Sequence, residues 1–146
     1  MEWTRGSYRM VNEKVNGRLL LPKHIWLGVS VENQKYTTRI KDLQQVPARV
    51  RFLSIEPLLG PVELTGPMLR GVRWVIVGGE SGHKARPMDS KWAINIQRAC
   101  RRHSVNFFFK QWGAFNAEGE RVGKKAAGRI LNGRTWDEMP ATIPSP

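Results

Sequence analysis

The sequence predicts an α/β domain with about four parallel strands and an irregular C-terminal tail. Four short segments are almost continuously apolar or β-branched rather than alternating, which is typical of strands buried on both faces of a parallel sheet. These segments are residues 25–31, 50–55, 74–77 and 105–109. The stretches between them can hold the crossovers that join parallel strands, which need about a dozen residues each.

The first crossover carries the signals of a helix. Asn33 can cap its N-terminus, and Pro47 forces it to end. Tyr36, Ile40 and Leu43 recur at helical spacing and would form its apolar face.

The other two crossovers differ from each other. Residues 57–73 are rich in glycine and proline, which predicts a loop with at most a turn or two of helix. In the third crossover, Asp89 or Ser90 can cap a helix. Its apolar stripe would hold Trp92, Ile96, Ala99, Cys100 and His103. Because Cys100 falls on this stripe, we interpret it as a small residue of the core.

We expect a single domain over residues 1–146. It divides into an N-terminal segment (1–21), a βα core (22–112) and a basic, glycine-rich tail (113–146). Glycines recur through the tail, which favours turns, with a hairpin as one form, over a long helix.

Composition limits the classes of partner and cofactor. The 24 lysines and arginines against 12 acidic residues give a net charge of +12, which indicates a negatively charged partner. Nucleic acid is the first candidate and an acidic protein face the second. One cysteine excludes an internal disulfide and any multi-cysteine metal or iron–sulfur site built by this chain alone. The three histidines lack metal-ligand spacing, so they predict no zinc site.

Three of the predicted strands end on a glutamate. Glu32, Glu56 and Glu80 follow one another at a spacing of 24 residues, and Lys110 closes the fourth strand. Since the carboxyl ends of parallel strands meet at one edge, these four residues predict a ligand site for a polar molecule, a metal ion or the cationic part of a substrate. Three neighbouring carboxylates would raise the pKa of at least one of them unless a cation intervenes. The alternative is that the carboxylates cap the helices and loops that follow.

The loop GGESGHKARP, residues 78–87, is a second candidate site. Its glycines allow close approach of the backbone, and positive charge precedes a helix N-terminus, which together suit phosphate or another anion. The candidate residues are Gly82, His83, Lys84 and Arg86. The alternative is an ordinary connection between strand and helix.

Basic residues of the third crossover helix and the tail are candidates for binding nucleic acid or a partner. They are Arg98, Arg101, Arg102, Arg121, Lys124, Lys125, Arg129 and Arg134. Trp112, Phe115 and Trp136 lie near them in sequence and could stack on bases. The alternative is a solvated basic face over aromatic residues of the core.

Several motifs also resemble a known family. WLGVSVEN, RFLSIEPLLGPV, WVIVGGESG with ARPM, FFFKQWG, and KKAAGR with LNGRTWDEMP occur in this order between about residues 18 and 140. Together they resemble the C-terminal half of a phage-associated protein family, itself similar to radical S-adenosylmethionine enzymes and spore photoproduct lyase. TRGSYRM, residues 4–10, is similar to the family's preceding strand-end motif.

The resemblance implies a partial β/α barrel, about half of one. Full-length members carry an upstream three-cysteine loop that would hold a [4Fe–4S] cluster and bind S-adenosylmethionine. This chain has no such loop, so we expect it to hold neither cofactor. The first strand of a half barrel is an open edge, and its inward side chains meet water. We therefore expect a homodimer or an obligate partner that covers this surface.

The function we expect is that of a non-catalytic, phage-encoded protein. Its basic surface would bind nucleic acid or a nucleic-acid-handling host complex such as a defence system. We therefore favour a binding protein over an enzyme. The alternative is an enzyme fragment with a small-molecule or metal site at the strand ends, working with a separate cluster-bearing chain. The third hypothesis is an evolutionary remnant that keeps the fold but has no function. No signal peptide or membrane-spanning run is evident, so we expect a cytoplasmic protein, in the host cell if phage-encoded.

Overall fold

The computed structural model describes residues 14–15, 18–19 and 21–141. The TRGSYRM motif and most of the predicted N-terminal segment lie outside the described residues. The first described elements are two short strands, β1 (Lys14–Val15) and β2 (Arg18–Leu19), which pair antiparallel with each other.

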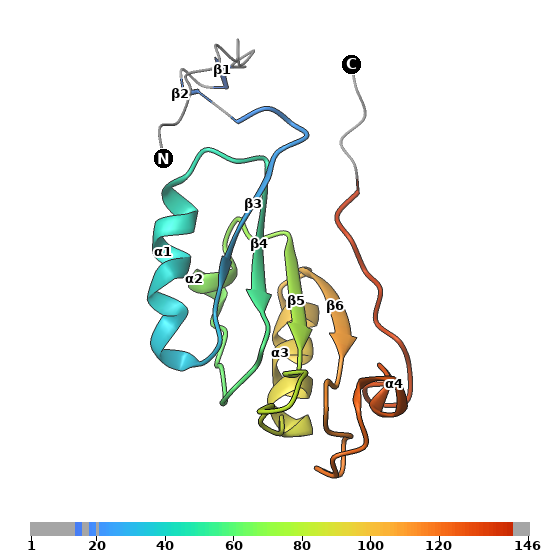
Figure 1. Ribbon diagram of the computed structural model, residues 1–146. Helices are drawn as coiled ribbons and strands as arrows, with labels where there is room; N and C mark the ends of the chain where they lie inside the picture. Colours follow the sequence, from blue (N-terminus) through green and yellow to red (C-terminus); the bar gives the residue numbers. More distant parts are fainter. Residues whose placement is uncertain (1–13, 16–17, 20, 142–146) are drawn as a thin grey trace, which may run out of the picture.

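The four strands that the apolar segments predicted are all present and parallel. They are β3 (Trp26–Ser30), β4 (Val50–Ile55), β5 (Trp74–Gly78) and β6 (Asn106–Gln111). Their spatial order is the order of the chain (Figure 1). The predicted α/β fold is therefore confirmed.

The first crossover folds as its capping signal predicted. A 3-10 helix, η1 (Gln34–Thr37), leads into α1 (Thr38–Gln45), and the Asn33 side chain accepts a hydrogen bond from the Lys35 N–H at 3.0 Å. Ile40 and Leu43 are buried against the sheet. The middle crossover holds only the single turn α2 (Gly66–Leu69), also as predicted.

The third crossover contains α3 (Ser90–Arg102), capped by the Asp89 side chain. Cys100 is fully buried in the core as predicted, and burial raises the pKa of its thiol to about 12. The prediction for His103 is wrong. It is exposed just beyond the helix, where its N–H caps the last carbonyls, and Gln97 is buried on the helix instead.

All three crossovers lie on one face of the sheet. α1 packs on β3 and β4, and α3 packs on β6. The strand residues that face this layer are buried in the core: Leu53, Ile55, Val75, Val77, Phe107 and Phe109. Figure 1 views the sheet from the other side, with α3 behind β5 and β6. Chain-order strands with crossovers on one face are the arrangement of a β/α barrel, but β3 and β6 do not pair, so the barrel is not closed.

The tail is irregular, as predicted, and it covers the outer edge of β6. The Phe109 N–H donates to the Trp136 carbonyl, and the Phe107 N–H donates to the Glu138 carboxylate, each at 2.9 Å. Leu131 lies in the core, and α4 (Lys124–Ala127) is a single turn. Among the described residues, the edge of β3 has no such cover.

The ends of β5 and β6 are held together by a close approach of two backbones. A side chain on Gly79 would overlap the carbonyl oxygen of Trp112, and one on Gly113 would overlap the carbonyl oxygen of Glu80. Gly113 also has a φ of +91°, which favours glycine. Ala114 completes the junction by donating its N–H to the Glu80 carbonyl at 2.9 Å.

Replacing Gly79 by alanine is expected to destabilise the protein by about 3 kcal/mol or more, because the obstructing atom is backbone that a rotamer change cannot move. Gly60→Ala is the matched control, since its new methyl group would make only an ordinary 3.6 Å contact with Asn33. Urea unfolding measures both. Equal stability of the two variants would contradict the close packing of this junction.

Candidate functional site

The open face of the sheet carries a row of aromatic rings that crosses all four strands. Trp74 lies at its centre, with ring centroids 5.8 Å from Trp26, 5.8 Å from Phe52 and 6.0 Å from Phe108. All four side chains are partly exposed. The Phe52 ring lies over Gly28, where any side chain would overlap it. We call Trp26, Phe52, Trp74 and Phe108 the aromatic row.

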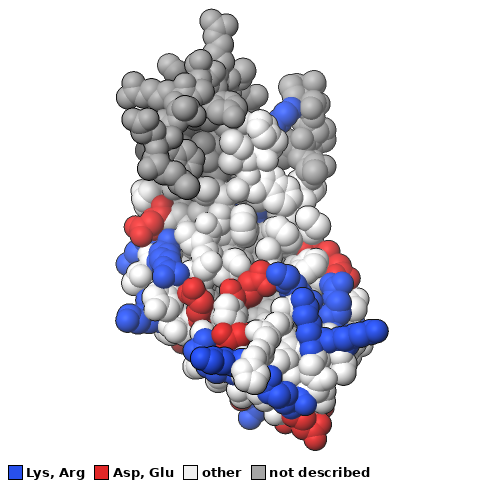
Figure 2. Space-filling model, viewed as in Figure 1, with Lys and Arg blue, Asp and Glu red and all other residues white. Residues whose placement is uncertain are grey.

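The sequence analysis missed the aromatic row, although the spacing of the aromatic residues along the strands indicates it. Strands of a parallel sheet place alternate residues on the same face, and aromatic residues occupy such positions in each strand. The apolar runs had been interpreted as buried on both faces. Figure 2 views this face and shows uncharged surface over the middle of the sheet, with charged side chains gathered below it where the strands end.

The predicted strand-end glutamates lie at this charged end, each beside a cation. Glu32 pairs with Arg39 of α1, with 3.2 Å between carboxylate and guanidinium. Glu80 accepts two hydrogen bonds from the Arg86 side chain and one from its backbone N–H, all at 2.9 Å. The alternative that these carboxylates serve local structure therefore describes Glu80 well, since it fixes the following loop.

Glu56 and Lys110 form the only one of these pairs that joins two strands. The Lys110 ammonium lies 3.0 Å from the Glu56 carboxylate, although β5 runs between them. Gly78 of β5 makes this contact possible, because its missing side chain would stand 3.2 Å from the Glu56 carboxylate and 3.6 Å from the Lys110 Cβ. The two side chains are 23% and 49% exposed, so a ligand can reach the pair.

The nearby cations change the electrostatics that three neighbouring carboxylates alone would produce. Hydrogen bonds from the Arg86 side chain, and then from its backbone, lower the pKa of Glu80 from its ordinary 4.5 to about 2. Glu80 therefore remains ionised at neutral pH, and its charge is already engaged. Arg86 in turn has its pKa raised by Glu80.

The predicted anion loop is held mainly by contacts within the protein. The Arg121 guanidinium donates to the carbonyls of Gly82, His83 and Ala85 at 3.1 to 3.3 Å, and Arg86 is bound to Glu80. Among the described residues, Lys84 has no ion pair. The anion site in this loop stays a prediction.

The eight predicted basic residues are divided among separate surfaces. Arg98 and Arg102 lie beside Trp92 and the loop before α2, Arg101 and Arg134 line a cavity near the start of β6, and Arg121 holds the loop just described. The remaining three, Lys124, Lys125 and Arg129, line a hollow of about 400 Å³ together with Lys110. We call these last four residues the cationic hollow.

Two of the three rings suggested for base stacking are buried. Trp112 and Trp136 are 4% and 7% exposed, and their indole N–H groups donate to the carbonyls of Ile130 and Leu131. Of the two alternatives that the sequence left open for these two rings, the structure shows the second, aromatic residues of the core. Phe115 lies under the Arg121 guanidinium, 4.7 Å from its ring centre.

The part of the chain that the structure describes contains neither a metal-binding cluster nor a membrane-spanning helix. No group of three or more histidine, cysteine, aspartate or glutamate side chains is placed to hold a metal ion. Within the same residues, no helix is long and apolar enough to cross a membrane.

These features define a partial β/α barrel with one open face and charged strand ends. The profile of a family described as "Protein of unknown function (DUF5131)" matches residues 3–140, and the chain belongs to this family. The same comparisons give no significant match to a curated protein or to a solved structure.

The low pKa of Glu80 predicts how acid affects stability. A carboxyl group with a lowered folded-state pKa contributes stability that is fully present above its unfolded value near 4.5 and is lost as the pH falls toward about 2. Glu80→Gln should therefore lower stability at pH 7 and flatten its decline between these pH values. Urea unfolding from pH 7 to pH 2 measures this. Glu118→Gln, an exposed carboxyl in the tail, is the control, and identical pH profiles for both variants would contradict the role of Arg86.

Proposed function

We propose that this protein binds single-stranded nucleic acid on the open face of its sheet. Bases would stack on the aromatic row, and the phosphate backbone would follow the cationic hollow. Arrays of aromatic rings beside positive charge are how many proteins hold single strands without strong sequence preference.

The observation that carries the proposal is the position of Arg129, which joins the two parts of this surface. Its guanidinium lies 5.3 Å from the ring centre of Phe108, at one end of the aromatic row, and the same residue lines the cationic hollow. Arg129 is also ion-paired with Asp137, so it is held in place on the tail. A strand that leaves the last ring therefore meets positive charge at once.

The charges of the cationic hollow are not all engaged within the protein. Lys110 pairs with Glu56 and Arg129 with Asp137, whereas Lys124 and Lys125 have no ion pair among the described residues. Two exposed lysines on the short helix α4 are available for phosphate groups. Partly exposed rings favour nucleic acid over an acidic protein face, because only the former offers a series of flat partners for stacking.

The test compares two double variants that remove the same charge. Lys124→Gln with Lys125→Gln should weaken binding to single-stranded DNA or RNA and reduce the salt dependence of the affinity, because fewer counterions are released. Lys41→Gln with Lys91→Gln, on α1 and α3, is the matched control and should bind like the native protein. Trp26→Leu should weaken binding about tenfold, since stacking contributes ~1–3 kcal/mol per base.

Fluorescence anisotropy with labelled oligonucleotides at several salt concentrations measures these affinities. No binding at low salt, or equal losses in the two lysine variants, would contradict the proposal.

The Glu56–Lys110 pair favours a second candidate, an enzyme fragment that is completed by another chain. In a closed barrel, strand-end residues that a ligand can reach are where catalytic groups lie. The motifs that resemble phage-associated relatives of radical S-adenosylmethionine enzymes support this candidate. The described residues offer no place for an iron–sulfur cluster, since the sole cysteine is the buried Cys100. In this candidate, a separate chain carries the cluster.

The second candidate requires a protein chain bound to the open face, whereas the first candidate requires nucleic acid bound there. The free edge of β3 and the aromatic row would then be covered by a second copy or by a cluster-bearing chain. Sedimentation velocity at micromolar concentration should show a dimer, or a complex with the co-expressed partner. A folded monomer that binds oligonucleotides would contradict the second candidate and support the first.

A further inference from the structure

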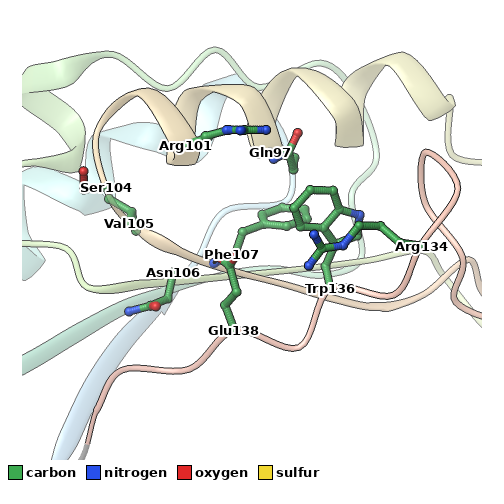
Figure 3. Close-up of a pocket in the computed structure, with 9 residues that line it drawn as sticks. All are labelled: Gln97, Arg101, Ser104, Val105, Asn106, Phe107, Arg134, Trp136 and Glu138. Atoms are coloured by element: carbon green, nitrogen blue, oxygen red, sulfur yellow. Dashed lines mark hydrogen bonds between the residues drawn. The ribbon is translucent and has the colours of Figure 1, made fainter.

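A cavity of about 450 Å³ lies away from the open face, between the last turns of α3, the start of β6 and the tail (Figure 3). It lies at the amino end of β6, opposite the charged strand ends that hold Glu56, Glu80 and Lys110. Its size is within the range of small-molecule sites. None of the interactions described above for the open face uses it.

The most informative residue of the cavity is Gln97. It is 7% exposed, yet its side chain makes no hydrogen bond with any described residue. An amide offers two donor hydrogens and an acceptor oxygen, and those of Gln97 have no partner among the described residues yet are not fully enclosed. A buried side chain of this kind that faces a cavity is suited to bind a ligand with its own donors and acceptors.

Two arginines supply positive charge to the same cavity. Arg101 stands one turn after Gln97 on α3, so both side chains leave the same face of the helix, as Figure 3 shows. Arg101 has no ion pair among the described residues. The Arg134 guanidinium, which belongs to the tail, lies 4.1 Å from the ring centre of Trp136. Its only hydrogen-bond acceptor among the described residues is the neighbouring Thr135 carbonyl.

The negative groups near the cavity are already engaged. Glu138 is the one carboxylate that lines it, and its oxygen accepts the Phe107 N–H at 2.9 Å. The last carbonyls of α3 accept hydrogen bonds from the N–H groups of His103, Ser104 and Val105. Two guanidinium groups against one bound carboxylate leave the cavity with an excess of positive charge.

We propose that this cavity binds a nucleoside monophosphate. The phosphate would lie between the Arg101 and Arg134 guanidinium groups, whose planar donors match its oxygens. The hydrogen-bonding edge of the base would pair with the Gln97 amide beside the wall that Trp136 and Phe107 form. The proposal concerns a different surface from the aromatic row, so it does not depend on the proposed function.

The nucleotide can come from two sources, a free mononucleotide or the phosphorylated 5′ end of a strand. Isothermal titration calorimetry with the four nucleoside 5′-monophosphates, adenosine and inorganic phosphate tests the first. Competition by oligonucleotides with a 5′ phosphate or a 5′ hydroxyl tests the second. At least one monophosphate or the 5′-phosphorylated oligonucleotide should bind more tightly than adenosine, phosphate and the 5′-hydroxyl strand.

The charge requirement is tested with two arginines of the same helix. Arg101→Ala should weaken binding of the best monophosphate at least tenfold, because charge-assisted hydrogen bonds are lost. Arg98→Ala removes the same charge but lies on another surface, beside Trp92, and should leave the affinity unchanged. Equal affinities for the two variants, or no monophosphate or 5′-phosphate binding by the native protein, would overturn the proposal.

Gln97→Met separates a binding role from a structural one. The variant should bind the monophosphate no better than inorganic phosphate. Without ligand it should melt at the same temperature as the native protein or higher, since the Gln97 amide makes no hydrogen bond with the described residues that the substitution could remove. A lower melting temperature with unchanged nucleotide affinity would overturn the assignment of Gln97 to the site.

Discussion

Among the described residues, helices and crossovers cover only one face of the parallel sheet, and the other features of the molecule depend on this constraint. Each crossover returns on the same side, so α1, α2 and α3 supply the apolar layer for one face alone. Parallel sheets are ordinarily covered on both faces. The row of rings around Trp74 is thus the unpaired half of what would be a second core, and it remains partly exposed.

The two edges of the sheet are treated differently, which sets the direction in which the fold could be extended. At β6, the tail satisfies backbone groups through Trp136 and Glu138 and blocks further pairing. At β3, the described residues provide no such strand. Additional strands that extend the sheet toward a barrel could therefore pair only with β3. The edge of β6 is covered by the tail, which also carries most of the cationic hollow. The tail is in this sense part of the core rather than an appendage.

Much of the fold followed from local patterns in the sequence. Apolar runs located all four strands, and Asn33 and Asp89 located the starts of two helical segments, because a cap is a short-range interaction. The charged residues at the strand ends, Glu32, Glu56, Glu80 and Lys110, were also found, because their position at the end of each strand is a local property. Their partners were not. The contact between Glu56 and Lys110 depends on Gly78 of the strand between them, and that register is not visible in the sequence.

The buried residues that the sequence analysis did not recognise as buried share one physical cause. Trp112 and Trp136 lie near basic residues in the sequence and were considered for base stacking, but the tail folds back onto β6 and buries them. Gln97 was not considered at all, because a polar side chain on a basic helix is usually solvated. Burial of each was decided by a segment distant in the chain. Local sequence patterns therefore predict which residues are charged or apolar and in which element they lie. Tertiary contacts decide which of those side chains remain accessible to a ligand.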